Sequence, residues 1–331
     1  MLKFNVLLQT LILLLSMHVL NAQSGKYDLL KKISVGDQGG WDYLSVDEVN
    51  RNLYVSHGIK VLVISLDRDS VVGEIPNTQG VHGIAIDNEL NKGFISDGRT
   101  NSVTAFDLKS FKTIDTLAIS GLNPDAILYE PFSKKVYTFN GKSHNASVID
   151  ATSFKMENTI DLPGKPEFAV TDLKGKLYVN IEDKSEIVQI DAIKQKIMNT
   201  WSISPGEEPS GLAIDKANNL LFSVCNNKKL IVFDVIKGKN VSTIPIGGGV
   251  DAVSFDPQTK LIYTSNGEGN VTIIKQFNFS TYSVIQTLST QAGSRTMTLD
   301  PKSKKIYLSA AKFEPGTRKM IPGSFEILVY Q

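Results

Sequence analysis

Short apolar runs that end in an acidic residue recur along the chain at intervals of about 40–44 residues. The runs are YLSVD ending at Asp47, GIAID at Asp87, AILYE at Glu130, FAVTD at Asp172, GLAID at Asp215, AVSFD at Asp256 and TMTLD at Asp300. Self-similarity at this period is typical of propeller blades and other repeat arrays. The repeat therefore constrains the fold more strongly than the length of 331 residues, which alone suggests about two domains.

Each unit contains four short segments that are rich in β-branched and aromatic residues and separated by turn formers. This pattern predicts an all-β, seven-bladed β-propeller with four antiparallel strands per blade and blades starting near residues 41, 81, 124, 166, 209, 250 and 294. The last unit ends at Gln331 after its third segment, whereas residues 26–36 resemble a fourth segment that precedes the first unit. We expect this N-terminal strand to complete the C-terminal blade, because ring closure covers a sheet edge.

The first 22 residues have the features of a secretory signal peptide. Lys3 precedes a mostly aliphatic stretch, residues 7–15, and the small residue Ala22 precedes the expected cleavage point at Gln23. We therefore expect a secreted or periplasmic protein in which residues 23–331 form a single propeller domain without a membrane span. A retained N-terminal anchor is the alternative interpretation.

The charge balance and the cysteine content narrow the possible partners and the sources of stability. Lys and Arg together number 35 and Asp and Glu 34, so the chain lacks the excess of positive charge on which nucleic-acid binding depends. This balance argues against a nucleic-acid partner but leaves room for a local basic patch. Cys225 is the only cysteine, so no disulfide can form within the chain, and we expect its thiol to be buried and inert. We expect a monomer that is stabilised by apolar burial and strand pairing.

Residues 229–267, KLIVFDVIKGKNVSTIPIGGGVDAVSFDPQTKLIYTSNG, resemble the YVTN-repeat family of seven-bladed β-propellers. The resemblance extends over nearly all of residues 23–331 and implies a propeller fold and a secreted or periplasmic location. It leaves the activity open, since related propellers include proteins of haem d1 biogenesis, single-stranded DNA binders and lactonases. The Gly-His and Trp-Asp signatures of WD40 propellers do not recur.

A bulky aromatic residue recurs in the second segment of every unit. The aromatic row consists of Tyr54, Phe94, Tyr137, Tyr178, Phe222, Tyr263 and Tyr307. We interpret it as core between blades, because large side chains at repeated positions are what stacked sheets require. A ligand platform is the alternative.

The residue five positions before each strand-ending acid is ionisable in six of the seven units. This set, the mouth ring, consists of Asp42, His82, Asp125, Glu167, Ser210, Asp251 and Arg295. Since the first strand of a propeller blade is innermost, these side chains should gather at one mouth of the central channel. Crowded like charges cost free energy, and such clusters are typical of ligand, metal or proton chemistry. The alternative is a set of solvated strand starts, where Asp suits turns.

A second ring is expected beside the mouth ring, three residues after each member of the aromatic row. Its members are His57, Asp97, Asn140, Ile181, Cys225, Asn266 and Ala310, and Glu182 follows Ile181. The second strand runs antiparallel to the first, so its end returns to the same face. The expected neighbours are Asp42 and His57, His82 and Asp97, Asp125 and Asn140, and Asp251 and Asn266.

The mouth ring contains candidate metal ligands, and the neighbouring loops contain candidate ligand contacts. His82, Asp125, Glu167 and Asp251 are the candidate metal ligands. Carboxylates with Asn oxygens suit Ca²⁺ or Mg²⁺, whereas carboxylates with His57 and His82 suit Zn²⁺ or Fe. Arg99, Lys142 and His144 are candidates for holding an anionic group, and Trp41, Tyr43 and Phe168 for contacting a flat ligand, unless these residues are simply solvated or packed.

These residues favour a binding protein that captures a small ligand at the channel mouth, with a divalent metal ion as the candidate cofactor. An enzyme is the first alternative, either a lactonase-like hydrolase with a metal and a carboxylate base or an oxidoreductase like the haem d1-biogenesis proteins with His57 or His82 as axial ligand. A scaffold for a protein or for single-stranded nucleic acid is the second alternative. No catalytic residue is predicted, because neither Gly-x-Ser-x-Gly nor His-Glu-x-x-His occurs.

Overall fold

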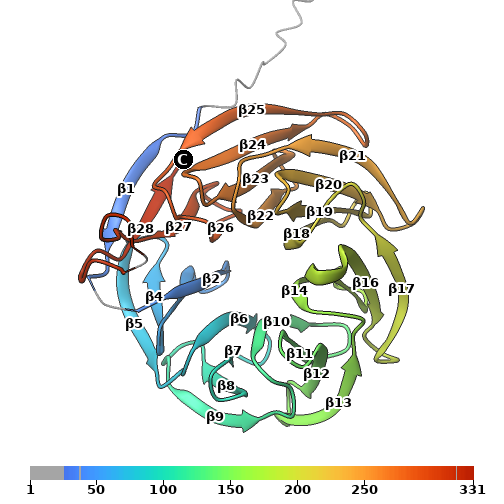
Figure 1. The fold of residues 1–331 in the computed structure, drawn as a ribbon. Coiled ribbons are helices and arrows are strands. Elements are labelled where there is room, and N and C mark those ends of the chain that lie inside the picture. The colour runs from blue at the N-terminus through green and yellow to red at the C-terminus, as the bar shows by residue number, and fades with distance from the viewer. Residues whose placement is uncertain (1–25, 37–38, 318) are drawn as a thin grey trace, which may run out of the picture.

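The computed structural model describes residues 26–36, 39–317 and 319–331, which form seven four-stranded antiparallel sheets. The sheets are arranged as blades around a central axis (Figure 1). The predicted all-β, seven-bladed propeller is confirmed. The predicted signal peptide lies outside the described residues. Within the described ranges, no helix is long and apolar enough to cross a membrane.

The first strand of each blade is innermost and borders the central channel (Figure 1). These strands are β2 (Trp41–Asp47), β6 (Val81–Asp87), β10 (Pro124–Glu130), β14 (Pro166–Thr171), β18 (Pro209–Asp215), β22 (Val250–Asp256) and β26 (Met297–Leu299). The last of them begins at Met297 rather than near residue 294, because the backbone turns at Gly293, whose carbonyl accepts the N–H of Arg295.

The second and third strands form the buried middle of each blade. The second strands are β3 (Asn52–His57), β7 (Lys92–Asp97), β11 (Lys135–Asn140), β15 (Lys176–Ile181), β19 (Leu220–Cys225), β23 (Leu261–Asn266) and β27 (Ile306–Ala310). The third strands are β4 (Lys60–Ser65), β8 (Ser102–Asp107), β12 (Asn145–Asp150), β16 (Glu186–Asp191), β20 (Lys229–Asp234), β24 (Asn270–Gln276) and β28 (Glu326–Tyr330). A short 3₁₀ helix, η1 (Glu182–Lys184), lies between β15 and β16.

The outermost strands include the predicted closing strand. They are β5 (Ser70–Pro76), β9 (Thr113–Ala118), β13 (Lys155–Asp161), β17 (Lys196–Ser202), β21 (Lys239–Pro245), β25 (Tyr282–Ser289) and, in the last blade, β1 (Leu29–Ser34). Strand β1 pairs antiparallel with β28, with Lys32 opposite Leu328 and Ile33 opposite Ile327. The N-terminal strand therefore completes the C-terminal blade, as expected.

The aromatic row lies in the core between blades. Each of its seven members is at most 2% exposed, so the core interpretation is confirmed. Tyr54, for example, packs 5.4 Å from Phe106 of the next blade, measured between ring centroids. Cys225 is also buried, as expected, and burial raises the pKa of its thiol to about 12.

The strand-ending acids organise the turns on the face opposite the mouth ring. The carboxylate of Asp47 accepts the backbone N–H groups of Val49 and Asn50, and Asp87, Glu130 and Asp215 repeat this arrangement. The acids recur because each first strand needs the same turn. Asp300 also accepts two hydrogen bonds from Arg51, at 2.9 and 2.6 Å, which join the last blade to the first.

Candidate functional site

The mouth ring gathers at one end of the channel, and three of its members form a compact cluster. Nδ1 of His82 lies 2.6 Å from a carboxylate oxygen of Asp42 and 3.7 Å from one of Asp125. One candidate ligand atom from each of these residues lies within 4.8 Å of the others. We call this group the Asp–His–Asp cluster. Its members come from β2, β6 and β10, so three adjacent blades build it.

A bulge in the inner strands directs these side chains toward the channel. The pairing register shifts between Trp41 and Leu44 in β2, and the equivalent shift occurs in β6, β10, β14, β18 and β22. A bulge places an extra residue on one strand and re-aims its side chain. Serines of the second strands satisfy the freed backbone groups: the N–H of Asp42 donates to Ser56 and that of Gly83 to Ser96.

The other half of the mouth ring is held by cations. Lys165 forms ion pairs with Glu167, at 3.1 Å, and with Glu182 of η1. Arg295 places its Nε 3.1 Å from a carboxylate oxygen of Asp251. The remaining member, Ser210, donates its hydroxyl to the carbonyl of Val250. Sequence reasoning missed Lys165, although its position two residues before Glu167 was a usable signal.

Burial and mutual repulsion raise the pKa values of the mouth-ring carboxyls. The pKa of Asp125 rises to about 7, chiefly because of burial and then because of the neighbouring charge of Asp42. Glu167 and Asp251 also reach about 7, again chiefly through burial, and the cations beside them only partly offset the rise. The ring therefore contains more negative charge than the protein neutralises near neutral pH.

The pKa of His82 is raised as well, but for an imidazole a raised pKa favours the charged form. Burial by itself lowers the pKa of its imidazole, but the hydrogen bond to Asp42 and the charges of Asp125 and Glu167 outweigh burial and raise it. Beneath this ring, Asp97 is buried and accepts a hydrogen bond from Thr104, and burial raises its pKa to about 7.

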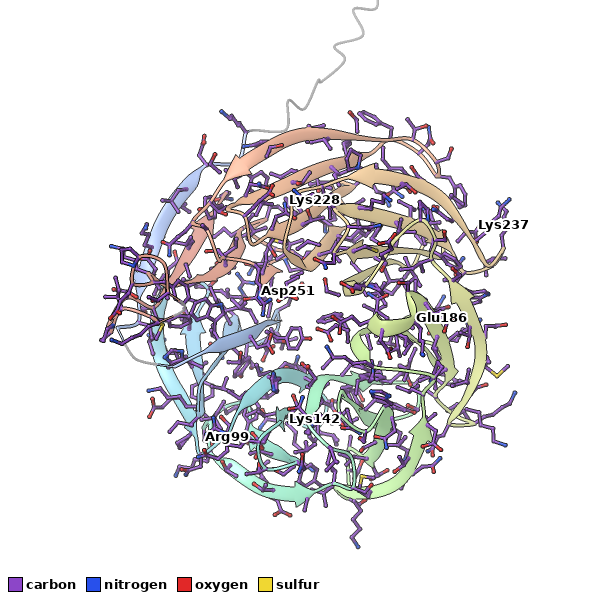
Figure 2. The ribbon with its side chains drawn as sticks, viewed as in Figure 1. Arg99, Lys142, Glu186, Lys228, Lys237 and Asp251 are labelled. Atoms are coloured by element: carbon purple, nitrogen blue, oxygen red, sulfur yellow. The ribbon has the colours of Figure 1, made fainter. Side chains whose placement is uncertain are left out.

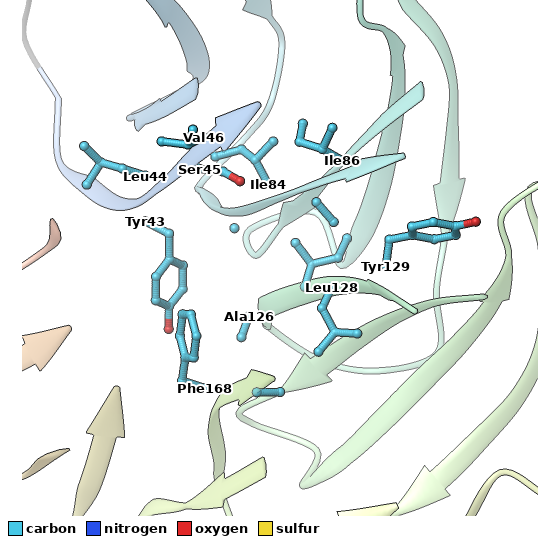
Figure 3. Close-up of a pocket in the computed structure, with 14 residues that line it drawn as sticks. Tyr43, Leu44, Ser45, Val46, Ile84, Ile86, Ala126, Leu128, Tyr129 and Phe168 are labelled. Atoms are coloured by element: carbon cyan, nitrogen blue, oxygen red, sulfur yellow. The ribbon is translucent and has the colours of Figure 1, made fainter. Parts of the chain in front are cut away.

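Two aromatic side chains lie across the channel beside the mouth ring. Tyr43 from β2 and Phe168 from β14 pack with ring centroids 5.2 Å apart (Figure 3). A cavity of about 330 Å³ lies next to them, lined largely by apolar side chains such as Ile84 and Leu128. Burial and then the charge of Asp125 raise the pKa of Tyr43. Tyr43 and Phe168 each follow a mouth-ring residue directly in sequence, Asp42 and Glu167, so the aromatic pair lies between the mouth ring and this apolar cavity.

Three members of the second ring, His57, Asn140 and Asn266, make their contacts away from the mouth ring, whereas Asp97 lies close enough to His82 for the imidazole charge to offset part of the rise in its pKa. His57 is 1% exposed and stacks on Phe325 at 4.2 Å between ring centroids. Asn140 bonds to Asn145 and Ser147, as Asn266 does to Asn270 and Thr272, within their own blades.

The reason for this arrangement is the register of the first two strands. His57 stands opposite Trp41, Asn140 opposite Pro124, and Asn266 opposite Val250, each one residue before the mouth ring. Successive residues of a strand point to opposite faces, so an offset of one residue turns the side chain away. Trp41 likewise packs against Phe313 and Phe325 rather than toward the mouth.

The basic loop residues are divided between two environments. Arg99 and Lys142 line a cavity of about 590 Å³ together with His82. His144 is exposed and lies outside the lining of that cavity. Asp251, at the edge of the central opening in Figure 2, belongs to the opposite side of the ring.

Comparisons with known proteins agree with the fold and give no activity. No family model matches the chain. The antigen Lp49 of Leptospira interrogans is 27% identical over 186 residues, which cover 54% of this chain and only 40% of that protein. The uncharacterized protein YncE of Salmonella typhimurium is 24% identical over 265 residues, 73% of each chain.

A solved structure shares the architecture. A chain of hydrazine synthase from Kuenenia stuttgartiensis superposes with a TM-score of 0.75, covering 88% of this chain and 96% of that one at 14% identity. Identity at this level shows a common fold alone. The solved structure therefore supports the propeller fold independently of the sequence pattern, whereas membership of the YVTN-repeat family remains a prediction.

Proposed function

We propose that this protein binds a small ligand together with a divalent metal ion at the mouth ring. The observation that carries the proposal is the Asp–His–Asp cluster, whose three candidate ligand atoms lie within 4.8 Å of one another. Three protein ligands leave coordination positions for water or for a bound molecule. One imidazole nitrogen with two carboxylates suits Zn²⁺, Mn²⁺ or Fe²⁺ better than Ca²⁺, which takes six to eight oxygens.

This ligand set differs from the one expected from sequence. Asp42 takes the place of Glu167 and Asp251, because Lys165 and Arg295 already pair with those two carboxylates. A metal ion beside Asp125 would also lower the free-energy cost of the crowded ring, since a nearby cation favours the charged form of a carboxyl group. The raised pKa values of the ring carboxyls thus support a cation site.

The test is calorimetric titration of metal-stripped protein with MnCl₂ and with ZnCl₂. We expect the parent to bind one ion and the Asp42→Asn, Asp125→Asn double variant to lose at least tenfold in affinity, as removal of charged ligands does. Asp161→Asn, an exposed change on β13, is the matched control and should bind as the parent does. Equal affinity of the double variant and the parent would refute the metal site.

A metal-dependent hydrolase is the second candidate, and one observation favours it. Glu167, which is not one of the proposed metal ligands, has a pKa of about 7, where a carboxylate general base works well near neutral pH. Hydrolysis of γ-butyrolactone, measured with and without Mn²⁺, tests this candidate. For the haem alternative, His57 is buried against Phe325, so the axial ligand would have to be His82, whose Nδ1 already lies 2.6 Å from Asp42.

We also propose that the protein is exported, cleaved after Ala22, and monomeric, with residues 23–331 as one domain. Lys3 and the aliphatic residues 7–15 support the cleavage. N-terminal sequencing of the protein outside the cytoplasm should begin at Gln23, and light scattering should give the mass of one chain. A start at Met1 in mature protein would contradict cleavage.

A further inference from the structure

A polar cavity of about 590 Å³ adjoins His82 between the second and third blades. Its polar side chains are those of Arg99, Asn101, Asn123 and Lys142, and the imidazole of His82 forms part of one wall. None of its lining residues carries a carboxylate. The volume is in the range of sites for small molecules, and the lining suits a negatively charged group.

The two cations of this cavity differ from the others at the mouth. Lys165 and Arg295 pair with acids at 3.1 Å, and Lys228, in the equivalent hairpin of the fifth blade, pairs with Glu268 at 3.6 Å. Arg99 and Lys142 make no salt bridge to any residue in the described part of the chain. Their positive charges therefore act together on one recess, where an anion would be attracted.

His82 connects this cavity to the Asp–His–Asp cluster. Its Nδ1 is engaged by Asp42 at 2.6 Å, so its Nε2 lies on the other edge of the ring. That edge lies against Gly98, where an added Cβ atom would be 2.6 Å from Nε2. Gly80 similarly leaves room for the Cβ of Arg99, which would lie 3.0 Å from an added Cβ atom. The two glycines thus let the imidazole and the Arg99 backbone approach each other.

We propose that this cavity binds the anionic group, a carboxylate or a phosphate, of the ligand whose other end contacts the metal ion in the Asp–His–Asp cluster. The second half of this statement rests on the proposed function, whereas the anion site depends only on Arg99, Lys142 and the cavity. The ligand class that follows is a small acid with a further oxygen donor. Metal ion and anion should strengthen each other's binding. The metal ion would offset the repulsion between the anion and the carboxylates of the mouth ring, and the anion would offset the repulsion between the metal ion and the side chains of Arg99 and Lys142.

The experiment is calorimetric titration of metal-stripped protein with inorganic phosphate and, separately, with malonate. We expect the parent to bind at least one probe and the Arg99→Ala, Lys142→Ala double variant to bind it at least tenfold more weakly, because hydrogen bonds to charged groups are strong. Lys228→Ala is the matched control, since it removes an exposed lysine from an equivalent hairpin, and it should bind as the parent does. Stronger binding of phosphate than of malonate assigns a phosphoryl group, and the reverse assigns a carboxylate.

Two results would overturn the anion site: binding of neither probe by the parent, or equal affinity of the parent and the double variant. Both side chains are exposed, so melting temperature is expected to change little and serves as the folding control. A further titration with MnCl₂ in malonate separates the two proposals. If the protein binds the anion through Arg99 but does not bind Mn²⁺, the metal site alone is refuted. If it binds Mn²⁺ but not the anion, the anion site alone is refuted.

Discussion

Replacing Asp125 by Asn should stabilise the metal-free protein at pH 8 and abolish its stabilisation by metal. Asp125 is 14% exposed and lies among carboxylates, and its pKa rises from 3.8 to about 7 on folding. Asn retains the size of the side chain and removes the charge. The change therefore isolates the electrostatic cost of the mouth ring from its packing.

The magnitude follows from the pKa shift. A shift of about three units at roughly 1.4 kcal/mol per unit gives an upper limit of about 4 kcal/mol for the cost of ionising Asp125 in the folded state. Water reaches the mouth and screens part of this repulsion, so we expect a gain of about 2 kcal/mol in the free energy of unfolding. For a chain of this length, that gain corresponds to about 4 °C in melting temperature.

The stability of the metal-free protein should depend on pH. Folding raises the pKa of Asp125, Glu167 and Asp251, so the folded protein binds more protons than the unfolded chain between about pH 4 and pH 7. The free energy of unfolding should therefore fall as the pH rises through this window. The Asn variant should show a shallower fall, and its advantage over the parent should vanish below about pH 4.

The assay is differential scanning calorimetry of metal-stripped protein from pH 4 to pH 8, with Asp161→Asn as the control. Mn²⁺ should restore the stability of the parent at pH 8 and leave the Asn variant unchanged. A melting temperature at pH 8 that is equal in the parent and the variant would refute the claim that Asp125 is ionised at a cost. An equally steep fall in melting temperature with pH in the parent and the variant would also refute this claim.

Three further predictions concern ring closure and the geometry of the site. Deleting residues 26–34 should expose the edge of the last blade and cause aggregation or a loss of many degrees in melting temperature. Light scattering and calorimetry test this, and a variant that stays monomeric and stable would contradict it. Arg51→Met should cost about 3–5 kcal/mol in urea denaturation, because it leaves the buried carboxylate of Asp300 without its bidentate partner; an unchanged midpoint would contradict this. Gly98→Ala should displace His82 and weaken Mn²⁺ binding about tenfold with little change in melting temperature; unchanged affinity in calorimetry would show that the ring has room to move.

The fold was predictable because its determinants are local and repeated. An apolar run ending in an acid appears in every blade, and the structure gives the acid the same role in most of them, as the carboxylate of Asp47 does for the turn at Val49. The burial of the aromatic row could be predicted for the same reason, since Tyr54 and its equivalents fill the same space between blades. Position within the repeat also placed His82 at the channel mouth between its neighbours Asp42 and Asp125.

The finer features depend on information that the repeat does not contain. The direction of His57 is set by its register with Trp41, and the bulge that follows cannot be read from composition. The contact between Tyr43 and Phe168 joins the first blade to the fourth, so it depends on how the blades are arranged around the channel and not on any single repeat. The pairing of Lys165 with Glu167 and Glu182 likewise depends on how η1 is placed.

The pairing of β1 with β28 has a consequence for the order of events during synthesis. Leu29 lies opposite Tyr330, so a strand from the start of the described residues pairs with one from their end. Contacts between residues so far apart in sequence form late, because a long loop must close first. Until the segment around Tyr330 has been synthesised, β1 lacks the β28 edge with which it pairs, and the nascent chain presents an open strand that a chaperone can hold.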